Sequence, residues 1–165
     1  MLPQTSFGKS PKPWCDWRTV EIGGLDTTPR AMLAAIVGAG MRVTGNAQVL
    51  LDKVRFAKNR KTLNLVLVTG PLLGVSTYEK VFEAAKMQGL SLCPAEVGPV
   101  LRQRYKDQPH SEWDVIAMKP ISDFYGTPYL FTLSHKDYRP SLDTWFRYPG
   151  SKWSSKNNFI FVLSD

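Results

Sequence analysis

Cysteine is scarce in this chain of 165 residues, which contains two, Cys15 and Cys93. They lie 78 residues apart (93 minus 15), a spacing that matches no metal-binding motif and allows at most one disulfide. A disulfide would also need an oxidising compartment. Because the N-terminus has no basic and then apolar leader with a small-residue cleavage site, we expect a cytoplasmic protein with two free thiols.

Long hydrophobic runs and phosphate-binding loops are also missing from the sequence. The longest apolar run, Leu63 to Leu73, is interrupted by polar residues, glycine and proline, and is much shorter than a membrane span. The segment from Gly70 to Gly74 lacks the Gly-Lys-Ser/Thr ending of a P-loop. We therefore expect neither a membrane partner nor a bound cofactor.

Acidic residues are outnumbered, since 21 Lys and Arg stand against 14 Asp and Glu, which gives a net charge of +7. Residues 1–61 hold ten cations and four acids, a net charge of +6, so the excess lies mainly in the N-terminal third. The densest stretch, Lys53 to Lys61, has five cations and no acid in nine residues. One interpretation is a solvated helix end, where cations complement the helix dipole. The other is a surface that contacts phosphates.

With 43% hydrophobic and 21% charged residues, the chain has the composition of one globular domain. Three helix starts are visible. Thr28 followed by proline is typical of a helix start and marks the first helix. Thr44 is the candidate cap of a second helix over residues 46–55. A capping box, Ser-Thr-Tyr-Glu, predicts that the third helix begins near Thr77.

Branched and aromatic residues predict the strands, which cover residues 19–22, 63–68, 113–118, 129–134, 144–148 and 159–163. Turn-rich pieces separate the last four, which is typical of an antiparallel meander. We expect an α+β fold, with two to three helices packed on an antiparallel four- to five-stranded sheet and a β-meander in the C-terminal half. Residues 1–18 are expected to form an irregular N-terminal arm before a single domain over 19–165. Trp14 and Trp17 would either dock that arm on the domain or stack on bases.

The segment from Cys93 to His110 joins the helical half of the chain to the strand-rich half. Its three prolines lack a backbone N–H and restrict the residues before them, so we expect an extended connector without a regular helix. In an extended segment alternate residues share one side, which would direct Arg102, Arg104 and Lys106 the same way.

A longer pattern runs through this connector: LCPAEVGP from Leu92 to Pro99, Leu101-Arg102, YKDQP from Tyr105 to Pro109, and Glu112-Trp113. With these residues the chain resembles a family of small uncharacterised bacterial proteins. The similarity continues more weakly at Gly40 to Arg42 and at Phe159 to Val162, and it leaves out roughly the first twenty residues. The resemblance implies a shared fold and no particular activity.

Cys93 with His110 or His135 is the candidate set for a cysteine-dependent hydrolase, in which a histidine would activate the thiol. No local cysteine-protease signature surrounds Cys93, so a small buried hydrophobe is the alternative. His110, Glu112 and Asp114 alternate on a predicted strand, but ligands so placed spread over about 13 Å, too far for one metal ion. A polar outward face is the other interpretation, and we expect no metal site.

The leading hypothesis is a noncatalytic binding protein whose basic surface meets a polyanion, either nucleic acid or an acidic protein face. Its candidate binding residues are Lys53, Arg55, Lys58, Arg60, Lys61, Arg102 and Arg104. One alternative is the cysteine hydrolase, and another is a protein-partner inhibitor or adaptor that uses the connector as its contact strip. Aromatic residues gathered between Phe124 and Trp153 would either fill the core or line a stacking surface.

Overall fold

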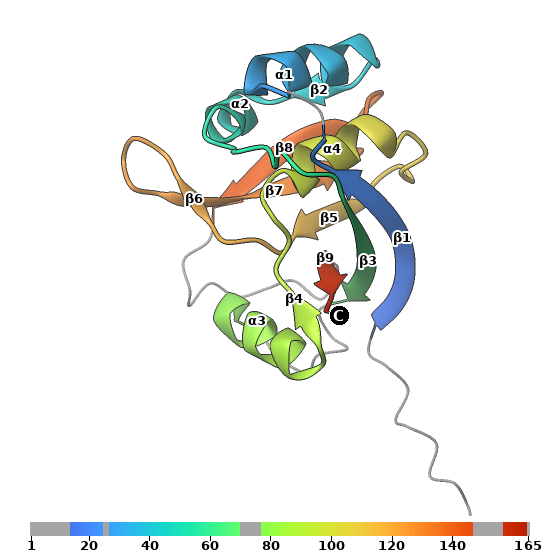
Figure 1. Ribbon diagram of the computed structural model, residues 1–165. Helices are drawn as coiled ribbons and strands as arrows, with labels where there is room; N and C mark the ends of the chain where they lie inside the picture. Colours follow the sequence, from blue (N-terminus) through green and yellow to red (C-terminus); the bar gives the residue numbers. More distant parts are fainter. Residues whose placement is uncertain (1–13, 25–26, 70–76, 147–156, 165) are drawn as a thin grey trace, which may run out of the picture.

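The computed structural model describes residues 14–24, 27–69, 77–146 and 157–164, in which helices pack on a single large sheet (Figure 1). The helices in these ranges are α1 (Pro29–Gly38), α2 (Gly45–Leu51), α3 (Tyr78–Met87) and α4 (Val97–Arg104). The strands are β1 (Trp14–Ile22), β2 (Arg42–Val43), β3 (Lys61–Thr69), β4 (Leu90–Ser91), β5 (Trp113–Ile116), β6 (Ile121–Ser122), β7 (Pro128–Ser134), β8 (Ser141–Phe146) and β9 (Asn158–Leu163). The α+β class is confirmed.

The sheet is larger than predicted and is mixed rather than antiparallel. Its nine strands follow the order β1-β3-β9-β5-β7-β8-β2, with β4 beside β9 and β6 beside β7. The pairs β5–β9 and β2–β8 are parallel, and the remaining pairs are antiparallel. The expected meander is confirmed for β5, β7 and β8. The last strand, β9, is not part of the meander and lies between β3 and β5. This insertion joins the two halves of the chain into one sheet.

The three predicted helix starts are confirmed by their caps. The hydroxyl oxygens of Thr28, Thr44 and Thr77 accept hydrogen bonds from backbone N–H groups three residues ahead, at 3.1, 3.3 and 3.4 Å. These bonds satisfy donors that have no partner within the helix. The helix predicted over 46–55 is shorter than expected, because α2 ends at Leu51.

Two predictions about irregular segments are wrong. The connector contains a helix, α4, because Pro99 is its third residue and lies in the first turn, where backbone N–H groups have no intrahelical partner. The predicted arm extends to residue 18, but β1 already begins at Trp14, whose side chain is buried. Residues 1–13 of that arm lie outside the described part of the chain.

The helices cover different parts of the sheet. Figure 1 shows α1 and α2 at one end of the molecule and α3 at the other. α4 lies so close to the sheet that a Cβ on Gly98 would be 2.9 Å from the side chain of Phe131 on β7. α3 packs through Phe82, whose ring centroid lies 5.8 Å from that of Phe161 on β9. Among the helices described, none has the length and apolar character needed to cross a membrane.

Candidate polyanion-binding surface

The basic loop, defined here as Lys53 to Lys61, follows α2 and ends at Lys61, the first residue of β3. The cations in this loop were predicted to contact phosphates, and all five side chains are exposed: Lys53, Arg55, Lys58, Arg60 and Lys61. The alternative of a helix end is wrong, because the last residue of α2 comes before Lys53. The charge is therefore carried by a loop.

The basic loop is held in place by two neighbours. The Glu96 carboxylate accepts hydrogen bonds from the backbone N–H of Ala57 at 3.1 and 3.3 Å. Burial raises the pKa of Glu96, and the Ala57 bond acts against that shift. On the other side, Gly24 donates its N–H to the Lys58 carbonyl at 3.1 Å. The loop thus has a defined course, anchored to the start of α4 and to the end of β1.

The basic loop lies unusually close to the Gly23-Gly24 turn. A Cβ on Gly23 would lie 2.0 Å from the carbonyl oxygen of Asn59, and the backbone there has a positive φ of 73°. Both conditions require glycine. This turn gives the basic loop a second fixed point.

Two of the five cations already have partners. Arg60 Nε forms an ion pair with Glu21 Oε1 at 2.8 Å, and Lys53 Nζ donates to the carbonyl oxygen of Ser122 at 2.5 Å. Arg55, Lys58 and Lys61 make no ion pair within the described residues. These three side chains are the ones available to an external anion.

The prediction for Arg102 is wrong, and the prediction for Arg104 stays open. Arg102 is fully buried, because its position in α4 turns it toward the sheet rather than toward solvent. Arg104 is exposed and lines a narrow cleft together with Phe56 of the basic loop and Val100. Arg104 therefore adds a cation beside the loop, while Arg102 belongs to the interior.

Arg102 is part of a buried polar network that sequence reasoning missed. Its guanidinium donates to Gln108 Oε1 at 2.5 Å, to the Ser141 carbonyl at 3.3 Å, and to the carbonyl of Tyr105. Burial lowers the pKa of Arg102 to about 10, and the nearby Asp114 opposes this shift. The residues after α4 are thereby tied to the sheet.

Asp114 was predicted to lie on a polar outward face, and this prediction is wrong. The side chain is fully buried on β5, where its carboxylate accepts from Gln108 Nε2 at 3.2 Å and from Asn158 Nδ2 at 3.1 Å. Burial raises the pKa of Asp114 to about 7, and the charge of Glu112 adds to the shift. Within the described ranges, no three His, Cys, Asp or Glu side chains are placed to hold a metal ion.

The hydrolase candidates do not form a site. Cys93 is buried and donates its S–H to the Ile160 carbonyl at 3.3 Å, and burial raises the pKa of this thiol. The His135 ring makes a 2.7 Å hydrogen bond to the Gln108 carbonyl, and the His110 ring makes a 3.0 Å bond to Ser111 Oγ. A nucleophilic cysteine needs thiolate character and access, and Cys93 has neither.

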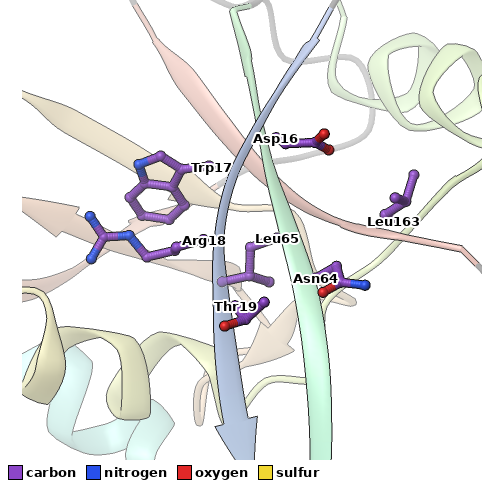
Figure 2. Close-up of a pocket in the computed structure, with 7 residues that line it drawn as sticks. All are labelled: Asp16, Trp17, Arg18, Thr19, Asn64, Leu65 and Leu163. Atoms are coloured by element: carbon purple, nitrogen blue, oxygen red, sulfur yellow. The ribbon is translucent and has the colours of Figure 1, made fainter.

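A separate hollow of about 360 Å³ lies beside β1 and β3 (Figure 2). Asp16 and Leu163 point to one side of β1, whereas Trp17 and Arg18 point to the other. The Arg18 guanidinium lies near both the Trp17 and the Tyr105 rings, 4.2 and 4.0 Å from their centroids. Charged groups do not converge on this hollow, so the basic loop is the stronger candidate for an anion site.

Comparisons with known proteins provide no further guide, because no family model, no curated protein and no solved structure matches this chain.

Proposed function

We propose that this protein is a noncatalytic binding protein whose basic loop, together with Arg104, contacts a polyanion. The observation that carries the proposal is that Arg55, Lys58 and Lys61 are exposed and make no ion pair with any described residue, although the loop itself is anchored. An anchored loop loses less conformational freedom on binding than a free one. Each phosphate that it neutralises releases counterions.

The alternatives have weaker support. A cysteine hydrolase would use Cys93, which is buried and whose pKa is raised by that burial. An adaptor that used the connector as a contact strip would need a continuous exposed segment, but Glu96 to Arg102 is buried throughout, and exposed residues such as Pro94 and Lys106 lie on either side of it. The basic loop has stronger support, because its cations are exposed and its backbone is anchored.

The test measures the binding of a fluorescent oligothymidylate of about 20 nucleotides by fluorescence anisotropy at increasing salt concentrations. Four contacts, from Arg55, Lys58, Lys61 and Arg104, predict a slope of log K against log salt of about −3 for a single strand. Affinity should then fall roughly 50-fold between about 50 and 200 mM salt.

The decisive variant combines Arg55→Glu with Lys58→Glu, which reverses two free charges and leaves the Arg60–Glu21 pair intact. The matched control combines Lys80→Glu with Lys86→Glu on α3, where two exposed lysines lie at the opposite end of the molecule from α2 (Figure 1). We expect the first variant to lose binding and the control to keep most of it. Equal loss in both would show that net charge, and not this surface, causes binding.

A further inference from the structure

Two aromatic side chains project from the turn that connects β6 to β7. Phe124 is 90% exposed and Tyr125 is 92% exposed, and they are adjacent in sequence. Exposed neighbouring aromatics of this size are unusual on a soluble surface, because burying either would remove considerable apolar area from water. The aromatic turn, defined here as Asp123 to Thr127, is therefore a candidate binding site.

The aromatic turn is closed by its own hydrogen bonds. Asp123 Oδ1 accepts from the backbone N–H groups of Tyr125 and Thr127, both at 2.9 Å. The Asp123 N–H donates to the Thr127 carbonyl at 3.0 Å, and the Gly126 N–H donates to the Asp123 carbonyl at 3.1 Å. The two aromatic residues are thus presented by a built turn and held away from the core.

The aromatic turn also contacts the basic loop, although the two are far apart in sequence. Lys53 Nζ donates to the carbonyl of Ser122, directly before the turn, and lies 5.6 Å from the centroid of the Phe124 ring. A cation at that distance from a ring interacts with its electron-rich face. The first cation of the loop therefore links the two features into one surface.

We propose that this combined surface binds single-stranded nucleic acid, with phosphates on the basic loop and unstacked bases on Phe124 and Tyr125. This inference rests on the proposed function and specifies its polyanion. Every base has a flat face that can stack on an aromatic ring, and single strands leave that face accessible. In a duplex the faces are occupied by neighbouring base pairs, so duplex DNA should bind more weakly.

An anionic membrane is the other macromolecule that cations and exposed aromatics attract. An anionic membrane is a less suitable partner for the aromatic turn, because the Asp123 carboxylate lies at the base of the turn. An inserted turn would carry that negative charge toward anionic headgroups. A nucleic-acid strand would instead have its phosphates on the loop and its bases on the turn.

The test compares two probes, a labelled oligothymidylate and labelled inorganic polyphosphate, which has charge but no bases. In the variant Phe124→Ala with Tyr125→Ala, oligothymidylate affinity should fall about 30-fold or more, because each stacked base contributes roughly fivefold or more. Polyphosphate affinity should stay unchanged. Tyr138→Ala, which removes an aromatic that is 99% exposed on another turn, is the matched control and should bind both probes normally. Phe124→Tyr with Tyr125→Phe should retain oligothymidylate binding.

Three results would overturn the inference. In the first, the double alanine variant binds oligothymidylate as tightly as the parent. In the second, it loses both probes equally. In the third, the parent binds phosphatidylserine vesicles through the aromatic turn, and it also binds duplex DNA as tightly as it binds oligothymidylate. If the parent bound neither oligothymidylate nor polyphosphate, the proposed function itself would fail, and this result is distinct from the other three.

Discussion

The Gln108 side-chain amide donates to the Asp114 carboxylate on β5 at 3.2 Å, and both residues are buried. The same Gln108 accepts from Arg102 through its oxygen, so one amide joins a buried cation to a buried acid. Buried charges are costly unless they are paired and hydrogen-bonded. This network therefore determines how the segment after α4 docks, and two of the predictions below concern it.

The first prediction is a pH dependence of stability that comes from Asp114. Its pKa is raised to about 7 in the folded protein by burial and by Glu112, from an ordinary value of 3.8. Between these values the folded state binds more protons than the unfolded state, so the free energy of unfolding falls as pH rises from about 4 to 7. A difference of one bound proton between the two states changes the free energy of unfolding by at most about 1.4 kcal/mol per pH unit.

The measurement is urea unfolding at several pH values for the parent and for Asp114→Asn. The variant cannot titrate at this position, so its stability should vary less between pH 4 and pH 7, whatever its absolute value. Glu112, Asn158 and Arg102 also influence this carboxylate and remain in both proteins. Parallel pH profiles for parent and variant would contradict the assignment.

The second prediction separates the two arginines of α4. Arg102→Met removes the donor to three buried acceptors, on Gln108, Ser141 and Tyr105. Such a loss in a buried ionic network costs about 3–5 kcal/mol. We expect this loss of stability in urea unfolding, whereas Arg104→Met, at an exposed position, should unfold like the parent and bind the oligothymidylate more weakly. The reverse pattern would mean that Arg102 meets the ligand.

Local signals in the sequence were sufficient for much of the secondary structure. Thr28, Thr44 and Thr77 marked helix starts, because a hydroxyl cap acts on backbone groups within three residues. The strands predicted over 63–68, 129–134 and 159–163 lie within β3, β7 and β9. The order of the strands was not predictable in this way, since the position of β9 between β3 and β5 depends on contacts between distant segments.

The helix α4 was missed because of the period that was assumed for the connector. The alternation of cations suggested a strand, but Val97, Val100 and Leu101 recur at helical spacing and are all buried on α4. A helical interpretation would have predicted α4 but not the burial of Arg102, because at 100° per residue Arg104 continues the stripe of Val97 and Leu101. For the candidate site, the exposed basic loop was predictable from charge density alone. Its contact with the aromatic turn was not, because Lys53 and Ser122 are 69 residues apart.

The third prediction concerns thiol reactivity. Cys15 is exposed on β1, and Cys93 is buried with its S–H bonded to a carbonyl and its pKa raised by burial. Alkylation requires access and thiolate, so iodoacetamide should modify Cys15 in the native protein and leave Cys93 intact until unfolding. Peptide mass spectrometry after timed labelling measures both sites in one sample. Fast native labelling of Cys93 would revive the cysteine hydrolase hypothesis.

The last prediction tests whether the course of the basic loop matters for binding. Gly23→Ala would place a methyl group 2.0 Å from the Asn59 carbonyl, so the loop would have to move. Gly40→Ala is the matched control, because Gly40 also has a positive φ, of 86°, but has no atom within 4 Å of the added Cβ. Both substitutions carry the left-handed backbone penalty of about 1–2 kcal/mol.

The Gly23 variant should therefore lose more stability than the Gly40 variant, and it alone should bind oligothymidylate more weakly. Thermal unfolding and anisotropy titration on the two proteins measure the two effects separately. The comparison is informative because backbone strain is common to both variants, while displacement of Asn59 is particular to one. If both variants bound with the parent's affinity, anchoring at Gly23 would have no role in recognition, and the cations would act through charge alone.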